Sequence, residues 1–150
     1  MLLNNSATVK DIPAPVFISS YADFLKRGGQ VEVPSWLNIV KTGIHRKNCP
    51  HNIDWFYLRL ASLARKFYIY KQKGVGSLKK NYGKKKKRGS RPAKRTSSSG
   101  KIIRYALQQL EKLKIIQKNN KEGRKITEKA QQDMDSRARK IYISTLNFRG

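Results

Sequence analysis

The segment that decides the fold is residues 54–70, DWFYLRLASLARKFYIY. Its aromatic and aliphatic side chains cover most of the circumference of the helix that their spacing predicts, with Asp54 as the N-cap. A helix that is apolar nearly all round is usually buried among other helices. We therefore expect this helix to lie at the centre of a helical core.

The polar exceptions in this helix form one narrow basic stripe. Arg59, Ser62 and Lys66 recur at intervals of three and four residues, and Arg65 lies beside Ser62. A guanidinium group on a rigid helix can bind a phosphate in a bidentate manner at a low entropic cost. These cations are therefore candidate phosphate ligands; the alternative is that they are solvated, or that an arginine stem packs on a neighbouring ring.

The rest of the chain predicts further elements around this helix. Apolar residues at helical spacing predict helices over residues 15–28 and 33–43. An amphipathic helix capped by Ser99 is followed by a hairpin over 115–127 and by a last helix over 128–140. The expected order is a set of N-terminal helices, then one helix, a two-stranded hairpin and a final helix. This order predicts a mainly α, winged-helix-like fold.

Residues 71–100 predict a long basic loop inserted between helices, because glycine, proline and serine interrupt them throughout. A stretch of about thirty residues without secondary structure is unusual inside a compact domain and commonly marks a functional or partner-ordered segment. A chain of 150 residues fits one domain. We expect that domain to span residues 1–140, with the loop inside it, and a basic tail to follow over 141–150.

Basic charge is concentrated in the middle of the chain. Residues 55–110 hold seventeen of the 34 Lys and Arg residues and no Asp or Glu, which gives +17 of the formal net charge of +25. Residues 1–54 come to +2 and residues 111–150 to +6. Uncompensated charge of this density repels itself, and a dense polyanion relieves the repulsion. The pattern indicates nucleic acid as the partner.

The candidate nucleic-acid-binding groups belong to this acid-free part. The run at 84–88 can neutralise phosphates without reading sequence, and its alternatives are a solvated loop or a nuclear-import signal. Gly74, Gly76 and Ser77 predict a turn whose backbone comes close to RNA or to another segment of the chain, although they lack a nucleotide-binding fingerprint. The candidate side chains are Arg59, Arg65, Lys66, Lys79, Lys80, Lys84, Lys85, Lys86, Lys87, Arg88, Arg91, Lys94, Arg95, Lys101 and Arg104.

Other chemistry has little support in the sequence. Cys49 is the single cysteine, which excludes an intramolecular disulfide, and with His45 and His51 it supplies three of the four ligands that a structural zinc site needs. The nine carboxylates form no pair placed for acid–base catalysis. No apolar run approaches the roughly 20 residues of a membrane span. We therefore expect no enzyme, metal, cofactor, membrane or small-molecule substrate.

An ordered series of motifs over roughly residues 8–138 resembles one family, protein nineteen of the eukaryotic and archaeal small ribosomal subunit. This family is unrelated to the bacterial protein of that number. A chance match to so many motifs in one order is rare. The motifs are Lys10-Asp11, Phe24-Leu25-Lys26, Val33-Pro34-Ser35-Trp36, Asp54-Trp55-Phe56-Tyr57-Leu58-Arg59, Gly74-Val75-Gly76-Ser77-Leu78, Tyr82-Gly83, Ala106-Leu107-Gln108-Gln109-Leu110-Glu111 and Gly123-Arg124-Lys125-Ile126-Thr127.

The resemblance implies a winged-helix-like protein bound to the rRNA of the small-subunit head, beside other head proteins, in the cytoplasm after a nucleolar assembly phase. It also implies a need in late pre-rRNA maturation and in export of the small subunit. The family's basic helix positions carry over to Arg59, Arg65 and Arg104, and its glycine-containing loop faces RNA. Residues 84–95 are richer in lysine than the family, and the chain after Arg139 matches it poorly.

Two alternative functions also fit a basic helical chain. A winged-helix DNA-binding or chromatin protein would place a recognition helix with polar side chains in the major groove. The helix over 54–70 is too apolar for this, and the later amphipathic helix exposes few residues beyond Lys101, Arg104, Gln108 and Gln109. The second alternative, an interaction adaptor, would rest on an unspecialised surface.

Overall fold

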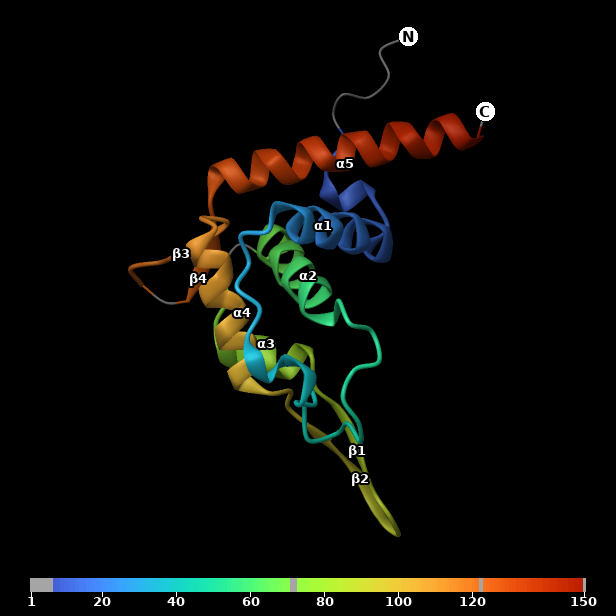
Figure 1. The fold of residues 1–150 in the computed structure, drawn as a ribbon, viewed down its shortest axis with the longest axis vertical. Helices are drawn as coiled ribbons and strands as arrows, with labels where there is room; N and C mark the ends of the chain where they lie inside the picture. Colours follow the sequence, from blue (N-terminus) through green and yellow to red (C-terminus); the bar gives the residue numbers. More distant parts are fainter. Residues whose placement is uncertain (1–6, 71–72, 122, 150) are drawn as a thin grey trace.

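The computed structural model describes residues 7–70, 73–121 and 123–149. The last helix lies across one end of the molecule, and a narrow hairpin projects from the other (Figure 1). The α-helices are α1 Ala14–Gly28, α2 Trp55–Ile69, α3 Val75–Asn81, α4 Gly100–Lys112 and α5 Glu128–Arg149. The strands form two antiparallel hairpins, β1 Lys84–Arg88 with β2 Arg91–Thr96 and β3 Ile116–Lys118 with β4 Arg124–Ile126. Short 3-10 helices lie at Val9–Asp11 and Ser35–Asn38.

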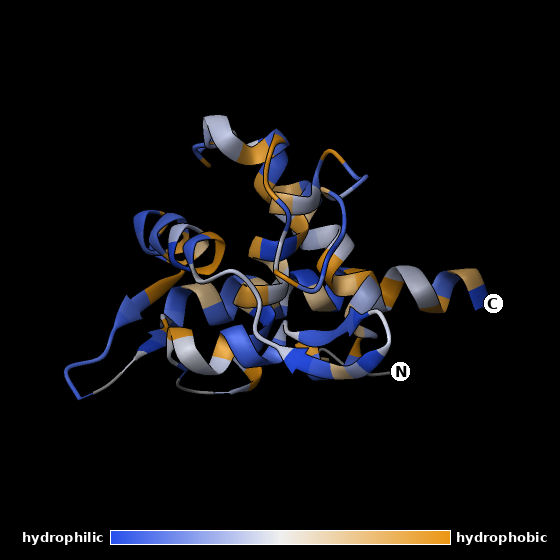
Figure 2. Ribbon diagram, turned by 90° about the horizontal axis from the view of Figure 1, so that it is seen from below, coloured by the Kyte–Doolittle hydropathy of each residue, from blue (hydrophilic) through white to orange (hydrophobic). Residues whose placement is uncertain are grey.

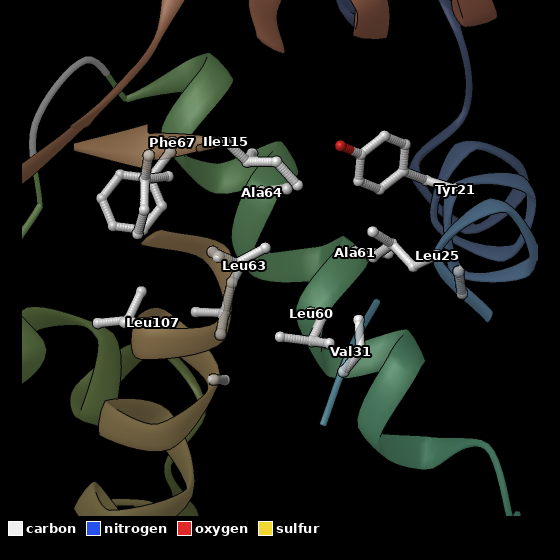
Figure 3. Packing of buried hydrophobic residues seen from close by; sticks show 14 of the residues in the cluster. Tyr21, Leu25, Val31, Leu60, Ala61, Leu63, Ala64, Phe67, Leu107 and Ile115 are labelled. Carbon is white, nitrogen blue, oxygen red and sulfur yellow. The ribbon is translucent and has the colours of Figure 1, made fainter. Parts of the chain in front are cut away.

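Helix α2 lies at the centre of the core, as its composition predicts. Phe56, Leu60, Leu63 and Phe67 on this helix are fully buried. Helices α1 and α4 pack against it, and Figure 3 shows side chains of α1 and Leu107 of α4 gathered around it. Burial of apolar surface contributes roughly 25 cal/mol per Å², so these contacts supply most of the stability of the fold.

Helix α1 begins and ends near the predicted residues. Pro15 lies in its first turn, where a missing backbone N–H leaves no helical hydrogen bond unmade. Gly29 ends the helix with a φ of +63°, a left-handed conformation that glycine adopts without strain. Tyr21 points into the core, whereas Phe24, three residues further along the helix, is 39% exposed beneath the guanidinium group of Arg137 from α5.

The C-terminal half has the order helix, hairpin, helix that the sequence predicts. After α4, strands β3 and β4 pair with Ile116 opposite Ile126. Helix α5 follows Thr127, whose Oγ1 accepts a hydrogen bond of 3.3 Å from the backbone N–H of Ala130. The mainly α, winged-helix-like fold is therefore confirmed.

Two predicted helix boundaries are wrong. The helix expected over 33–43 is only the 3-10 helix Ser35–Asn38, and Ile39 just after it is 77% exposed. A segment this short cannot offset the cost of helix nucleation, and its β-branched residues favour extended backbone. At the other end, α5 continues through the expected tail as far as Arg149, because no proline or glycine interrupts residues 128–149.

The loop expected over residues 71–100 is also wrong wherever the structure describes it. Residues 71 and 72 lie outside the described residues, and α3 with the β1–β2 hairpin fills most of the remainder. The two strands meet at a two-residue turn in which Gly89 has a φ of +68°. Pro92, which has no N–H for the ladder, stands in β2 where the register shifts by one residue. Glycine and proline therefore shape a hairpin here rather than an irregular loop.

Candidate nucleic-acid interface

Tyr82, at the end of α3, holds the basic stripe of α2 in place. Its hydroxyl oxygen is 2.6 Å from Oγ of Ser62, and the centre of its ring is 4.1 Å from the guanidinium carbon of Arg59. The ammonium nitrogen of Lys66 lies 5.2 Å from the same ring centre. A cation above an aromatic face gains about 0.5–2 kcal/mol. The sequence predicts Arg59, Ser62 and Lys66 on one stripe, and the structure confirms this placement. The sequence does not indicate that Tyr82 contacts all three.

The cations of this stripe lack a carboxylate partner in the described part of the chain, where the three ion pairs join other residues. Burial lowers the pKa of Arg59; Tyr82 opposes this effect, and nearby Arg46 adds to it. Burial also lowers the pKa of Lys66, with smaller contributions from neighbouring cations. Within the described residues, Nε of Arg65 is buried without a hydrogen-bond acceptor. Half-buried cations of this kind are stabilised by an external anion.

A groove of about 710 Å³ opens beside the stripe. Ile18 of α1 and Trp55 of α2 form part of its apolar wall, while Arg46, Lys47 and Arg59 supply positive charge. An apolar wall beside several cations suits a nucleotide, because a base and a phosphate need these two different surroundings. Sequence reasoning missed Arg46 and Lys47, since their segment has no periodicity and residues 33–53 carry only three cations, against seventeen in residues 55–110. Only the fold brings them next to α2.

The β1–β2 hairpin carries eight of the candidate phosphate ligands within residues 84–96. Its strands are largely hydrophilic, whereas the hydrophobic residues lie mainly on the helices (Figure 2). The register places like charges opposite one another, which destabilises a sheet, and an isolated two-stranded hairpin is marginally stable at best. The pairs of like charge are Lys85 with Arg95, Lys86 with Lys94, and Arg88 with Arg91.

The base of this hairpin is fixed to the helical body. A side-chain N–H of Arg95 donates a hydrogen bond of 2.9 Å to the backbone carbonyl of Lys80 in α3. Gly83 lies so close to the backbone of Thr96 that a Cβ atom there would clash with the Thr96 carbonyl oxygen. The direction of the hairpin is therefore set by the core, although its far end has no core of its own.

The cations predicted near the start of α4 are brought together by the packing of α3 on α4. A Cβ atom at Gly100 would lie 3.1 Å from a guanidinium nitrogen of Arg104 and 3.3 Å from Cδ of Lys79, so both side chains reach the first turn of α4. The ammonium nitrogen of Lys101 is 5.2 Å from the ring centre of Trp36. These positions extend the basic surface from α2 and the hairpin onto α4.

Gly74, Gly76 and Ser77 do not form the loop that we expected. Gly74 is the N-cap of α3, and the other two lie exposed in its first turn. A Cβ atom at either glycine would meet nothing within 4 Å, so the protein itself does not require glycine there. A close approach of RNA to this turn stays a prediction.

Helix α4 offers little for reading bases in a DNA groove. Lys101, Arg104 and Gln108 are exposed, but Gln109, expected beside them, is only 2% exposed. Its Oε1 accepts a hydrogen bond of 3.1 Å from the backbone N–H of Glu32. The outward face of α4 is therefore narrower and less polar than a recognition helix requires.

The remaining candidate chemistry can be placed on the structure. Cys49 is exposed, and its thiol donates a hydrogen bond of 3.3 Å to the carbonyl of Ile39. Over residues 7–70, 73–121 and 123–149, no three His, Cys, Asp or Glu side chains gather into a set that could hold a metal ion. None of the described helices combines the length and the apolar character needed to cross a membrane.

A winged-helix-like body with a basic stripe, a mixed groove and a cationic hairpin has the features of the nucleic-acid-binding class. Comparison with known proteins narrows the class: the chain belongs to the ribosomal protein S19e family, whose model matches residues 8–144.

Its relatives cover most of the chain. Small ribosomal subunit protein eS19A of Saccharomyces cerevisiae is 47% identical over 129 residues, covering 85% of this chain and 90% of the relative. The eS19 protein of Oryza sativa subsp. japonica is 41% identical over 141 residues, covering 94% and 97%. The eS19B protein of Schizosaccharomyces pombe is 44% identical over 128 residues, covering 85% and 90%. The family resemblance seen in the sequence is confirmed.

Proposed function

We propose that this protein is a structural constituent of the small ribosomal subunit that binds rRNA in the subunit head. The observation that carries the proposal is the placement of the acid-free segment. The described residues between 55 and 110 form mainly α2, α3, the β1–β2 hairpin and most of α4, and α4 packs on both α2 and α3. Sixteen of the seventeen basic residues of this segment lie in its described part and are thereby held on one connected body without an acidic residue among them. The relatives support the ribosomal assignment, because their names place them in the small subunit.

The two kinds of basic element divide the work of binding. Arg59 of α2 is half-buried and held by Tyr82, so it meets a phosphate with little loss of conformational freedom. The hairpin supplies a high density of cations that replaces counterions on the RNA. A-form RNA presents a deep, narrow major groove, so recognition rests on shape and backbone rather than on base sequence.

We extend the proposal to assembly. A chain with this much uncompensated charge gains most when it binds RNA early, since binding removes its self-repulsion and holds converging rRNA segments together. We propose that it joins the small-subunit head during nucleolar assembly, is needed for pre-rRNA maturation, and stays beside rRNA and neighbouring head proteins in cytoplasmic ribosomes.

Quantification of the protein in purified ribosomes tests the proposal. At moderate salt, we expect one copy for each small subunit and none on free large subunits. Depletion of the protein should cause pre-rRNA of the small subunit to accumulate. A substoichiometric amount that falls further with each wash would overturn the structural role, and normal pre-rRNA levels after depletion would overturn the role in maturation.

A further inference from the structure

The β1–β2 hairpin carries cations on both of its faces. Successive side chains along a strand point to opposite sides of the ribbon, and directly paired residues share a side. The ladder pairs then divide the basic residues into two sets. Face A consists of Lys84, Lys86, Arg88, Arg91 and Lys94, and face B consists of Lys85, Lys87 and Arg95.

Neither face offers a surface that a protein core would cover. The apolar side chains of the strands are those of Pro92 and Ala93, and both are exposed. The hairpin also points away from the helices, which leaves its two sides open (Figure 1). A two-stranded ribbon normally gains stability by burying one apolar side, and this ribbon has none. What stabilises it must supply negative charge to both sides.

We propose that the hairpin inserts between two phosphate backbones of folded RNA, one against each face, and so bridges two RNA segments that are not paired with each other. This inference rests on the proposed binding of rRNA. A regular A-form helix does not provide such a site, because its major groove is too narrow for a ribbon and its shallow minor groove would cover one face only. Two separate segments satisfy both faces.

The anchored base of the hairpin supports this geometry. The hydrogen bond of Arg95 to Lys80 and the tight contact of Gly83 with Thr96 fix the ribbon relative to α3. A ribbon of fixed direction holds two backbones at a fixed separation, whereas a floppy lysine-rich tail would wrap around one. On face B, Lys85 and Lys87 are available for phosphate contacts, whereas Arg95 also donates the hydrogen bond that anchors the hairpin to α3.

Two matched double variants test the bridge. Lys84→Gln with Lys86→Gln removes two charges from face A, and Lys85→Gln with Lys87→Gln removes two charges of the same kind from face B of the same strand. Hydroxyl-radical probing of rRNA in small subunits carrying each variant should show two separate losses of protection, in different rRNA helices. Binding of the whole protein to small-subunit rRNA should lose about 1.4–1.8 units of salt-dependence slope with either variant.

Several outcomes would overturn the bridge without touching the proposed function. If both variants lose protection at the same nucleotides, the hairpin binds a single backbone. If only one variant loses protection, the other face of the hairpin is solvated. Should a double variant fail to assemble, iron tethered at Lys86→Cys or Lys87→Cys, each combined with Cys49→Ser, gives the same comparison by local RNA cleavage. The unaltered chain is counted in the same ribosomes, and its absence there would contradict the proposed function itself.

Discussion

The α2 stripe and the β1–β2 hairpin both present cations, but they are built on opposite principles. The stripe has few charges on a helix whose other residues are largely buried, and Tyr82 positions two of the charges, Arg59 and Lys66. The hairpin has eight charges on a ribbon whose paired residues repel one another. The comparison shows that preorganisation and charge density are separate sources of affinity for RNA, and this chain carries both.

The difference sets the size of the effect of each substitution. Losing a preorganised arginine removes a contact that no neighbour can replace, because the groove fixes its position. Losing one hairpin lysine leaves seven cations in the same ribbon. A single substitution should therefore weaken RNA binding most when it lies in α2, and a combined substitution of many residues should weaken it most when it lies in the hairpin.

The largest expected effect is that of neutralising the whole hairpin. Replacement of its eight Lys and Arg residues by Gln should lower the slope of log K against log salt by roughly 6 to 7 units for binding to small-subunit rRNA, because each lost phosphate contact removes about 0.7–0.9. Affinity measured by filter binding across a salt series checks this. A control that neutralises the exposed residues Lys10, Lys129 and Lys140, outside the acid-free segment, should leave the slope unchanged. A fall of less than 2 units with the hairpin variant would show that most of the ribbon faces water.

Reversal of one charge on α2 comes next. Arg59→Glu should reduce incorporation into small subunits about tenfold or more, since it loses a positioned cation and puts a carboxylate in the groove where phosphate is expected. The fraction of tagged protein that sediments with small subunits, in cells that also express the unaltered chain, measures the effect. Arg65→Glu should behave similarly.

The matched control for this reversal is Lys86→Glu, which makes the same charge change in the hairpin. Its incorporation should fall by less than about threefold, because seven cations remain beside it. Thermal unfolding of each purified variant separates loss of folding from loss of binding. Equal defects from Arg59→Glu, Arg65→Glu and Lys86→Glu would abolish the distinction between the stripe and the hairpin.

The two regions also differ in how far the sequence predicts them. The helix over 54–70 has a periodicity that decides both its burial and its polar stripe, so its position and its buried face are confirmed, while RNA binding by its candidate residues stays a prediction. The hairpin has no such pattern, because every residue of β1 is basic and alternation cannot be seen in a uniform run. Gly89 and Pro92 mark a turn and a bulge, yet the same residue types are equally common in irregular loops.

Contacts between distant segments could not be predicted from the sequence, for a different reason. Arg46 and Lys47 join the groove beside Arg59, and Tyr82 sits on the stripe, only after the chain has folded back on α2. No local pattern encodes such a meeting, since it depends on the path of irregular segments. The extension of α5 to Arg149 was within reach, because the sequence holds no signal to stop it.

A smaller effect on stability is expected when the hydroxyl of Tyr82 is removed and the charges of the stripe are left unchanged. Tyr82→Phe keeps the ring under Arg59 but removes the hydroxyl that lies 2.6 Å from Oγ of Ser62. We expect a loss of about 0.5–1.5 kcal/mol in the free energy of unfolding, with the melting temperature falling by about 2–4 °C per kcal/mol. Ser62→Ala is the matched variant, and the double variant should cost less than the two single changes added together. An unchanged melting temperature would show that the hydroxyl contact between Tyr82 and Ser62 does not stabilise the protein, which would leave the ring alone to hold the stripe.

The smallest expected effect is a gain in the stability of the hairpin, whereas the preceding substitutions are expected to cause losses. Lys86→Glu places a carboxylate opposite Lys94, so a repelling pair becomes an attracting one and the ribbon should gain about 0.2–1 kcal/mol in the protein without RNA. Amide hydrogen exchange in the strands should slow severalfold at low ionic strength, and the gain should shrink in 1 M salt, where charges are screened within about 3 Å. Lys87→Glu is the control, because Lys87 has no directly paired residue in the register. Equal slowing in both variants would mean that reduced net charge, rather than the ladder pair, stabilises the ribbon. Slowing confined to Lys86→Glu would establish that the pairing of like charges across the ladder lowers the stability of the hairpin.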